Sequence, residues 1–500
     1  MIEYIIVQAG GRGSRLDELT KNKPKALVPV DNLPMLFHLF RQFPDRKFII
    51  IGDYKFGVLE KYLQAFAGAD YRLVNSHGKT GNCAGLSRAL SYIPDGAPLL
   101  LIWCDLILPD GHLLPDGSRQ MIGISRGFPC RWKYENGKLA EEPSSEYGVA
   151  GYFVFREKAA LSGVPESGEF AAWLQQKEMS FEPLALDGTR EYGLYSEWAK
   201  LPMPKCRPFN RLERRGDRIV KYPIDGQGRQ LAKRETDWYR LAAASGIRNI
   251  PHIDQYEPLC MEYIEGKNLY ETAEISPEEK KRILARIVSC LKEIHSLGQI
   301  KADRDSCYEA YIGKTAERLA KVRELIPFAG DRRIRINGRS CRNVFYHLEE
   351  LEALVMSGLP EYFCVIHGDC TFSNILLRED HTPVLIDPRG YFGHTEICGD
   401  PAYDWAKLYY SLVSNYDQFN LKRFRLDIGE NEVSLEIASS HWESMEDTFF
   451  SLLSGEVTPK RLKLLLSIIW LSLTSYAWEN YDSVCGAFYQ GLYYLEEVLP

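Results

Sequence analysis

The chain of 500 residues lacks the features that mark secreted, zinc-binding or nucleic-acid-binding proteins. Its 12 cysteines are scattered and form no Cys-x-x-Cys pair, so we interpret them as small core residues in a reducing compartment. The 61 lysines and arginines do not gather into a basic arm, and the formal net charge is -7. We therefore expect no nucleic-acid partner.

Export and membrane signals are also missing. The start, Met1–Val7, has no basic region and no cleavage site, and its pattern predicts a first strand. The one long apolar run, Leu462–Trp478, is short and contains Lys463 with several serines and threonines, which favours a buried helix. We expect a cytoplasmic protein with no membrane span. The sequence does not indicate its oligomeric state.

Length and composition indicate more than one ordinary globular domain. With 45% hydrophobic and 26% charged residues, the chain resembles soluble proteins in composition, and it is too long for one core. The segment Leu201–Pro208 contains three prolines and is the best candidate for a boundary. We predict one domain over residues 1–204 and another over residues 205–500.

Strands and helices alternate over the first 160 residues. The predicted strands are Tyr4–Gln8, Phe48–Gly52, Arg72–Asn75, Leu99–Asp105, Met121–Arg126 and Val149–Arg156, and the predicted helices are Met35–Phe43, Val58–Phe66 and Leu86–Ile93. Continuous apolar strands separated by amphipathic helices are typical of a doubly wound, mostly parallel sheet with both faces covered. The pattern predicts a Rossmann-like α/β domain.

The pattern changes after residue 208. Two short strands, Asn210–Arg214 and Arg218–Tyr222, predict a hairpin; a helix over Lys233–Ala244 and a strand over Leu259–Tyr263 follow. From Pro277 onward the chain is mostly helical. A small β lobe (about 207–265) before a large helical lobe (about 266–500) predicts a bilobal, protein-kinase-like α+β domain.

A glycine-rich turn follows the first strand and suits phosphate binding. The nucleotide-binding residues predicted there are Ala9, Gly10, Gly11, Gly13 and Ser14. Glycines let backbone N–H groups close on phosphate oxygens, and the helix that we expect next adds partial positive charge. The Arg15 guanidinium can fork across a polyphosphate, and Lys25 supplies a fixed ammonium. A dinucleotide-binding turn is the alternative, but the Gly-x-Gly-x-x-Gly spacing is absent.

The motifs Gly11–Leu16 and Lys23–Leu27 resemble the signature of the nucleotidyltransferases that activate phosphorylated sugars and phosphocholine with an NTP. The resemblance implies that Arg15 and Lys25 contact the reacting phosphates. It also implies that Asp105 holds Mg²⁺ and that Asn82 contacts the base. The implied reaction is attack by a substrate phosphate oxygen on the α-phosphorus, with release of pyrophosphate.

The same resemblance leaves two points open. The family has a second acidic metal ligand, for which Asp187 fits by its Gly-Thr context and Glu197 fits by position. The domain is short, like the phosphocholine cytidylyltransferases, so CTP is the first choice of nucleotide.

A second phosphate signature lies in His367–Asn374 and Val384–Arg389. It places a carboxylate at Asp369, an amide at Asn374 and another carboxylate at Asp387. ATP-dependent phosphoryl transfer to a hydroxyl needs one carboxylate to receive the alcohol proton, with an amide and a carboxylate to hold Mg²⁺. These residue types in this order therefore predict a kinase.

The block resembles the aminoglycoside phosphotransferase and choline kinase family of small-molecule kinases, over about residues 207–500. The resemblance implies that Asp369 is the catalytic base and that Asn374 and Asp387 bind Mg²⁺. It implies that Lys221 pairs with the ATP phosphates and that Glu235 orients it. Lys233 is the alternative to Lys221, which we favour because it ends a strand.

Further positions follow from the same family. The backbone near Glu262 and Tyr263 is expected to contact the adenine edge, while His367 and Asp404 are expected to brace the catalytic loop. Arg389 departs from choline kinases, because its charge would repel a quaternary ammonium and suit an anionic or hydroxyl-rich substrate. The aromatic residues Trp470, Tyr476 and Trp478 fit a cation–π box, but a helical core explains them better.

We therefore hypothesise a bifunctional transferase with Mg²⁺ as cofactor and with ATP and a second NTP as substrates. The kinase domain would phosphorylate a small alcohol, sugar or polyol, and the first domain would transfer a nucleotidyl group to the new phosphate, giving a precursor of a capsule or lipopolysaccharide. The alternative is an active kinase whose first domain is a degenerate nucleotide sensor or scaffold. A non-enzymatic binding module is disfavoured because Asp105, Asp369, Asn374 and Asp387 are all present.

Overall fold

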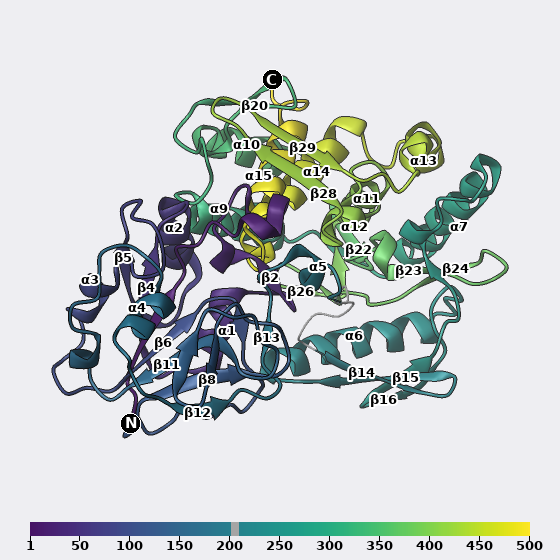
Figure 1. Cartoon of the computed structure of the whole chain (residues 1–500). Helices are drawn as coiled ribbons and strands as arrows, with labels where there is room; N and C mark the ends of the chain where they lie inside the picture. The colour runs from purple at the N-terminus through teal and green to yellow at the C-terminus, as the bar shows by residue number, and fades with distance from the viewer. Residues whose placement is uncertain (202–209) are drawn as a thin grey trace. The chain divides into compact units, whose positions relative to one another are not determined.

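The computed structural model describes residues 1–201 and 210–500 of the chain. The predicted boundary between residues 204 and 205 lies outside the described residues. The chain divides into two compact units, Met1–Pro202 with Trp478–Tyr481 and Met203–Ala477 with Asp482–Pro500 (Figure 1). We describe each unit by itself.

A nine-stranded mixed sheet forms the centre of the first unit. Its strands are β1 (Tyr4–Gln8), β4 (Lys47–Gly52), β5 (Asp70–Asn75), β6 (Leu99–Trp103), β8 (Met121–Ser125), β9 (Lys133–Glu135), β10 (Lys138–Ala140), β11 (Gly148–Phe155) and β12 (Glu182–Ala185). Strands β6, β1, β4 and β5 are neighbours in this order and run parallel. Strand β11 pairs antiparallel with β6 and β8, so the sheet is parallel at its centre and mixed beyond it.

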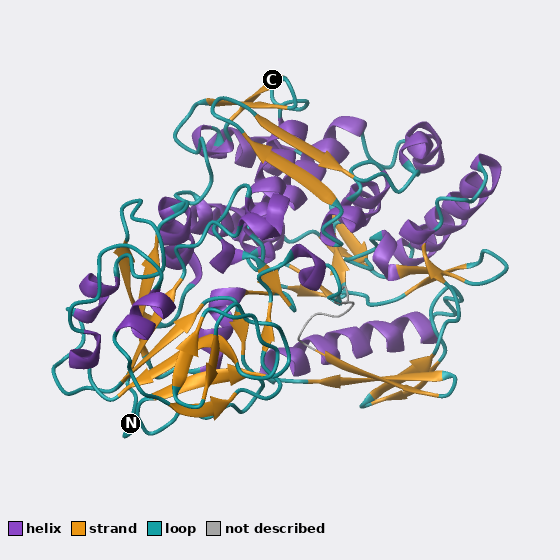
Figure 2. Cartoon of the chain, viewed as in Figure 1, coloured by secondary structure: helices purple, strands orange, loops and turns teal. Residues whose placement is uncertain are grey.

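Helices cover both faces of this sheet (Figure 2). They are α1 (Met35–Gln42), α2 (Phe56–Phe66), α3 (Leu86–Leu90) and α4 (Phe170–Gln176). Ile49 of β4 belongs to the core that includes Leu86 of α3 and Phe170 of α4. Its neighbour Phe48 packs instead against Phe40 of α1, with ring centroids 4.8 Å apart. Since successive strand residues point to opposite faces, α1 and the α3–α4 pair lie on different sides, and the predicted doubly wound α/β class is confirmed.

Short elements complete the first unit. They are β2 (Pro29–Val30), β3 (Leu33–Pro34), β7 (Leu106–Ile107), β13 (Arg190–Glu191) and α5 (Tyr195–Trp198). Strand β13 pairs antiparallel with β7, which places Glu191 opposite Leu106. This two-residue ladder brings the end of the unit back beside the carboxyl end of β6.

The second unit begins with an antiparallel sheet of four strands in the order β14 (Asn210–Arg215), β15 (Arg218–Pro223), β17 (Leu259–Glu262) and β16 (Ile253–Tyr256). Helix α6 (Gly226–Ala244) starts earlier than the predicted residue, Lys233. Gly226 and Gly228 lower the helix propensity of this first turn, so the sequence pattern did not predict it as helical. The Asp225 side chain compensates as N-cap, because it accepts a hydrogen bond of 2.7 Å from Gly228 N–H.

The rest of the second unit is mainly helical. Its helices are α7 (Pro277–His295), α8 (Arg304–Tyr308), α9 (Lys314–Val322), α10 (Leu348–Ser357), α11 (Pro401–Leu412), α12 (Tyr416–Asn420), α13 (Glu446–Leu453), α14 (Pro459–Leu473) and α15 (Tyr481–Leu495). Helix α14 contains most of the long apolar run and packs against α11 and α9, which explains its hydrophobicity. Among the described residues, no helix is both long enough and apolar enough to cross a bilayer.

Small strands frame the catalytic segments of this lobe. They are β18 (Lys267–Asn268), β19 (Gln299–Lys301), β22 (Tyr362–Val365), β23 (Ile375–Leu377), β24 (Pro383–Leu385), β25 (Tyr391–Phe392), β26 (Thr395–Glu396) and β27 (Cys398–Gly399). β23 and β24 form a hairpin in which Ile375 pairs with Leu385. The hairpin therefore brings the segments that hold Asn374 and Asp387 to the same end.

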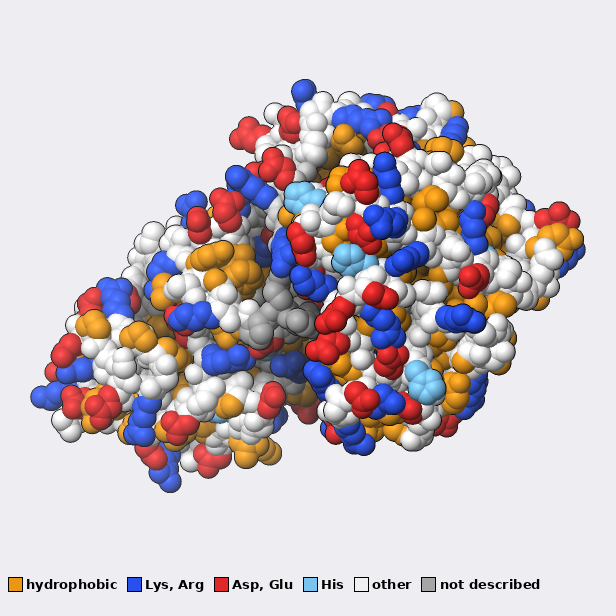
Figure 3. All heavy atoms as spheres, turned by 90° about the vertical axis from the view of Figure 1, so that its right-hand side faces the viewer, with side chains coloured by type: hydrophobic (Ala, Val, Ile, Leu, Met, Phe, Trp, Pro, Cys, Tyr) orange, Lys and Arg blue, Asp and Glu red, His pale blue; other side chains and the backbone are white. Residues whose placement is uncertain are grey.

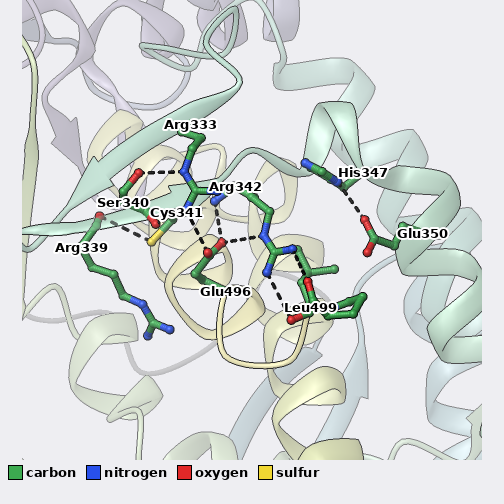
Figure 4. A network of polar contacts seen from close by, with 10 residues as sticks. Arg333, Arg339, Ser340, Cys341, Arg342, His347, Glu350, Glu496 and Leu499 are labelled. Atoms are coloured by element: carbon green, nitrogen blue, oxygen red, sulfur yellow. Dashed lines mark hydrogen bonds and ion pairs between the residues drawn. The ribbon is translucent and has the colours of Figure 1, made fainter.

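One sheet of the helical lobe was not predicted. It has the order β21 (Arg339–Arg342), β20 (Arg333–Ile336), β29 (Val433–Ile437) and β28 (Phe424–Ile428). Two hairpins meet where Ile336 pairs with Val433. The two hairpins are far apart in the sequence, so neither indicates its partner. Figure 4 shows how this sheet is held to α15: Glu496 accepts hydrogen bonds from Arg342 N–H (2.7 Å), Arg342 Nε (3.1 Å) and Arg333 Nη2 (2.9 Å).

The surface agrees with the scattered charge of the sequence. On the face drawn in Figure 3, basic and acidic side chains are interspersed and neither sign forms one continuous patch.

The Glu496 network predicts a pH-dependent contribution to stability. Burial alone would raise the pKa of Glu496, but the hydrogen bonds from Arg342 and Arg333 outweigh it and hold the pKa below the ordinary value of 4.5. A depressed carboxylate pKa stabilises the fold above the ordinary pKa, and this stability is lost as the pH falls through the folded pKa. We expect Glu496→Gln to lower the local free energy of unfolding by about 1–3 kcal/mol at pH 7.

Hydrogen exchange of residues 333–342 in increasing urea measures this effect. The difference between wild type and Glu496→Gln should shrink when the pH falls below 4.5. Glu436→Gln, which changes an exposed glutamate of β29, is the matched control and should leave exchange unchanged. Equal protection of wild type and Glu496→Gln at pH 7 would contradict the assigned role.

Candidate active sites

A cleft of about 810 Å³ opens in the first unit at the carboxyl ends of its parallel strands. Its lining includes Gly10, Gly11, Arg15, Lys25 and Asp105, which the sequence singled out. Ligands of open α/β sheets bind at this edge, because the loops after parallel strands meet there. The structure therefore brings these five residues into one cavity, whereas the predicted residues Ala9, Gly13 and Ser14 do not line it.

The glycine-rich loop lies over Lys25. A Cβ on Gly13, whose φ is +67°, would come within 3.1 Å of the Lys25 Cβ, so glycine permits this close approach. Among residues 1–201 and 210–500, no acceptor takes a hydrogen bond from the backbone N–H of Gly11, Arg12 or Gly13. These donors are available to phosphate oxygens.

The helix expected after this loop was predicted wrongly. Residues Ser14–Thr20 form a 3₁₀ segment that is interrupted at Asp17, where φ is 49° and ψ is -123°. A short, kinked 3₁₀ turn does not align enough peptide dipoles to act as a helix N-terminus. Positive charge at this loop comes instead from Arg15, which is exposed, and from Lys25.

Lys25, Asp105 and Glu191 form one charged cluster at the floor of the cleft. Lys25 Nζ makes an ion pair with Asp105, and Glu191 interacts with the same carboxylate. Although burial opposes it, Lys25 holds the pKa of Asp105 below its ordinary value. Burial and the charge of Asp105 raise the pKa of Glu191 to about 7. The cluster thus concentrates negative charge that a cation would stabilise.

Sequence reasoning missed Glu191. Of its two alternatives, Asp187 is exposed in a turn and Glu197 pairs with Lys200 at 2.7 Å, and neither lines the cleft. Glu191 reaches the site because Tyr192 N–H bonds to the Asp105 carbonyl at 3.2 Å, next to the β7–β13 ladder. No motif marks a two-residue strand pair, so the sequence gave no signal for Glu191.

Asn82 lines the cleft, but its side chain also has a structural contact. Its carboxamide oxygen accepts a hydrogen bond of 2.6 Å from Phe170 N–H, at the start of α4. The predicted base contact is left to its amide nitrogen and to neighbouring groups. Asn82 therefore positions the loop as well as facing the cavity.

The Asp105 and Glu191 carboxylates fit a magnesium ion. Mg²⁺ in nucleotide enzymes is held by one or two carboxylates together with phosphate oxygens and water. Two adjacent carboxylates, one with a raised pKa, match this donor set. The described residues contain no metal site formed by three or more histidine, cysteine, aspartate or glutamate side chains.

In the second unit, Asp369 lies in a compact polar loop. Asn374 Nδ2 donates to the Asp369 carbonyl (2.7 Å) and to its carboxylate (3.1 Å), which leaves the Asn374 oxygen available to a cation. Lys407 Nζ, from α11, forms an ion pair of 2.9 Å with Asp369 Oδ1. The sequence gave no motif for Lys407, which lies beyond the recognised block.

Asp404 holds the backbone of this loop from beneath. Its carboxylate accepts hydrogen bonds from His367 N–H (2.8 Å) and Gly368 N–H (2.7 Å), and it contacts His295 Nε2 at 3.0 Å. Burial lowers the pKa of His367, so this ring is neutral at physiological pH. The structure thus places Asp404 and His367 where a bracing role requires them.

Lys221 lies between two carboxylates. Its Nζ is 2.6 Å from Glu235 of α6 and also forms an ion pair with Asp387. Asp387 has a left-handed backbone, with φ of 57°, which is uncommon outside glycine and typical of constrained sites. The alternative, Lys233, is 70% exposed and pairs with Asp237 on its own helix. The geometry favours Lys221 for the phosphate role.

In the segment expected to contact adenine, two backbone N–H groups already donate hydrogen bonds within the protein. Glu262 N–H bonds to the His252 carbonyl and Tyr263 N–H bonds to the Asp217 carbonyl, both at 2.8 Å. The N–H groups of Glu262 and Tyr263 are therefore not available to a base. Within the described part of the chain, Ile264 N–H donates to no acceptor, so it is the donor left at this position.

Arg389, the predicted substrate residue, lies near Asp369 and is held by two phenol groups. Its guanidinium donates to Tyr403 OH (3.0 Å) and to Tyr391 OH (2.8 Å). Although burial opposes the charge, these phenols and Asp369 hold the pKa of Arg389 above its ordinary value. Trp470 is fully buried against Tyr410 and Tyr476 contacts Arg318, so these aromatics form core and cation contacts and no box for a quaternary ammonium.

Comparison with known families agrees with this division. The model of the MobA-like NTP transferase domain matches residues 5–120, and the model of the phosphotransferase enzyme family matches residues 209–434. Both are enzyme families. The chain is therefore a fusion of a nucleotidyltransferase domain with a phosphotransferase domain, which confirms the resemblance found in the sequence.

Individual relatives are more distant. A UTP–glucose-1-phosphate uridylyltransferase of Haloferax volcanii is 29% identical over 100 residues, which covers 19% of this chain and 41% of that enzyme. The chain thus spans less than half the length of this relative.

Solved structures with similarity to the chain fall into the same two groups. The inositol-1-phosphate CTP transferase from T. maritima is 15% identical, with a TM-score of 0.33, and the match covers 39% of this chain and 91% of that chain. The CTP:phosphocholine cytidylyltransferase from Streptococcus pneumoniae is 19% identical with a TM-score of 0.33, over 40% and 98%. The gentamicin–APH(2″)-IIa complex is 18% identical with a TM-score of 0.36, over 56% and 84%.

The loop behind the first cleft predicts a sensitive position at Gly81. Its φ is +85°, and a Cβ there would lie 2.2 Å from the Gly168 carbonyl oxygen, which bonds to Cys83 N–H. We expect Gly81→Ala to displace this loop and weaken Mg²⁺–CTP binding about tenfold or more, since the left-handed strain alone costs roughly 1–2 kcal/mol. Calorimetric titration measures the affinity.

Gly57→Ala is the matched control. Gly57 lies inside α2 with no heavy atom near its Cβ position, so alanine should preserve binding and stabilise the fold slightly. ATP affinity at the second unit should not change in either variant. Unchanged CTP binding by Gly81→Ala would show that this loop does not shape the cleft.

Proposed function

We propose that the two domains of this fusion catalyse consecutive steps on one small molecule. The phosphotransferase domain transfers the γ-phosphoryl group of ATP to an alcohol, sugar or polyol. The nucleotidyltransferase domain then joins a nucleotidyl group, with CTP as the first choice, to the new phosphate. The product would be an activated building block for a cell-surface polysaccharide such as capsule or lipopolysaccharide.

The order of the steps follows from their chemistry. In the first, the acceptor oxygen forms a bond to the γ-phosphorus, its proton passes to Asp369, and the bond between the γ-phosphorus and the β,γ-bridging oxygen breaks to release ADP. In the second, an oxygen of that phosphate bonds to the α-phosphorus of the NTP and pyrophosphate leaves. The second step needs a phosphate acceptor, which the first step makes.

Residues of each unit have distinct parts in these steps. Asn374 and Asp387 would hold Mg²⁺ in the kinase site, and Asp105 and Glu191 would hold it in the first cleft. The ion there would neutralise phosphate charge and orient the reacting groups. Lys221, fixed by Glu235, would bind ATP phosphates, while Lys25, Arg15 and the N–H groups of the glycine-rich loop would bind the triphosphate of the second nucleotide.

One observation carries the proposal for both activities. The chain contains two separate sets in which a lysine and oxygen ligands converge: Lys25 with Asp105 and Glu191, and Lys221 with Asp387 near the Asp369 loop. A kinase with a degenerate sensor would not need a second acidic ligand in the first cleft. The presence of Glu191 beside Asp105 therefore favours an active first domain over that alternative.

Two assays with the full-length protein test the proposal. ATP consumption is measured with free acceptors, and pyrophosphate release is measured with CTP, UTP, ATP, GTP and dTTP plus phosphorylated acceptors. We expect Asp369→Asn to lower ATP consumption about 100-fold or more, because general base catalysis contributes at least this much. Asp105→Asn and Glu191→Gln should lower pyrophosphate release by a similar factor and leave ATP consumption intact.

The two sets of variants serve as controls for each other. Each variant should lose one reaction and retain the other, which also shows that it is folded. Pyrophosphate release that is absent with every NTP, with kinase activity intact, would support the sensor alternative and refute the bifunctional proposal.

A further inference from the structure

The acceptor side of the kinase site is rich in positive charge. Two cations lie beside Asp369: Lys407 of α11 and Arg389, which follows β24. Lys314 and Arg318 of α9 lie close to these two, and we name the four side chains the basic cluster. Three of them influence the charge of Lys314. Within the described part of the chain, Lys407 alone of these four has a carboxylate partner, Asp369.

The other three cations lack an ion-pair partner. In residues 1–201 and 210–500, no carboxylate forms an ion pair with Lys314, Arg318 or Arg389. Arg389 is held by two phenol oxygens, and Arg318 donates to the Ser472 carbonyl at 2.5 Å and to its hydroxyl at 3.1 Å. These neutral acceptors orient the guanidinium groups without neutralising them.

Lys314 has the least favourable position in the cluster. Its side chain is partly buried, and among the described residues its ammonium group makes neither a hydrogen bond nor an ion pair. Burial lowers its pKa well below the ordinary value, and the charges of Arg389, Arg318 and Lys407 lower it further. Glu309 is the acidic group that opposes this effect. Lysines in such surroundings are costly unless an anion pairs with them.

The local backbone presents these charges on one side of α9. Lys314 and Arg318 are four residues apart, so they lie on the same helix face, where like charges repel. A π-helical turn, Glu309–Gly313, leads directly into Lys314. Such turns are rare in proteins as a whole. Where they occur, they are often found at functional sites, because they change the direction in which the following helix presents its side chains.

We propose that the alcohol phosphorylated at this site carries a carboxylate or phosphate group, bound by Lys314, Arg318 and Arg389 while its hydroxyl faces Asp369. This inference rests on the proposed kinase function and specifies its substrate class. The anionic group of the substrate supplies the negative charge that these three cations lack in the protein. Its position relative to Asp369 selects which hydroxyl reacts. A cationic acceptor such as choline is excluded by the same charges.

Anion binding is tested first, since it needs no turnover. Unfolding temperatures of full-length wild type and Lys314→Met are compared in inorganic phosphate, glycerate and glycerol at constant ionic strength. We expect phosphate and glycerate to stabilise the wild type more than Lys314→Met, and glycerol to act equally on both. Other anion-binding sites, including the first cleft, are the same in the two proteins, so their contribution to the unfolding temperature cancels in the comparison.

The same variant separates a ligand role from a structural one. Without added anion, Lys314→Met should unfold at the same or a higher temperature than wild type, because a buried, repelled charge is removed. Lys281→Met, which changes an exposed lysine of α7, is the matched control and should behave as wild type in every condition. Equal stabilisation of wild type and Lys314→Met by anions, or a destabilised Lys314→Met without them, would overturn the proposal.

A kinetic experiment is the second test of the proposal. ATP consumption is compared for glycerate, glycerol 3-phosphate and glycerol, which share a hydroxyl and differ in the anion; the two anionic acceptors distinguish carboxylate from phosphate. We expect kcat/KM to be about tenfold or more higher for an anionic acceptor, and this advantage to vanish in Lys314→Met mainly through KM.

The outcomes separate this inference from the proposed function. An equal loss of kcat with glycerol and with the anionic acceptors would assign the cluster to the transferred phosphoryl group and refute an anionic acceptor. If the anion effect on stability is found and ATP is never consumed, the anion site stands and the kinase proposal fails. If ATP is consumed with no preference for anionic acceptors and no effect of Lys314→Met, the kinase stands and this inference fails.

Discussion

Both candidate active sites depend on a buried lysine that carboxylates keep charged. Lys25 is paired with Asp105, and Lys221 is placed between Glu235 and Asp387. Removing a lysine from water favours its neutral form, and opposite charges at contact distance reverse this preference. In each unit the fold has to bring these partners from separate elements: from the loop after the glycine-rich turn and from β6 in the first, and from β15, α6 and the segment after β24 in the second.

Small elements of backbone provide much of this alignment. The β7–β13 ladder contains two residue pairs, yet it determines that Glu191 lies beside Asp105. Asp404 accepts two N–H groups of the Asp369 loop, so α11 fixes both this loop and Lys407, three residues further along the same helix. Catalytic precision therefore comes from a few hydrogen bonds to backbone groups, supported by large apolar cores.

The sequence predicted the parts of the fold that local periodicity and known motifs encode. Six of the nine strands of the first sheet and both strands of the β14–β15 hairpin were placed within two residues, because apolar runs and turn residues mark them. The short strands β9, β10 and β12 were missed. The sheet of β20, β21, β28 and β29 was missed, since its pairing joins segments distant in sequence. Glu191, Lys407 and Lys314 were missed for the same reason: their importance arises from neighbours that only the folded chain supplies. Arg389 was noticed because it departs from a motif, whereas the cations around it belong to none.

The Lys25–Asp105 pair has a consequence for nucleotide entry. In the free cleft each group already has an opposite charge as neighbour, although neither has its reaction partner. Under the proposed function, Lys25 would bind a phosphate and Asp105 would bind the cation, so each charge would exchange one partner for another. The ion pair already holds both side chains in position in the folded protein, so the electrostatic cost of assembling the cleft would be met during folding and not during binding.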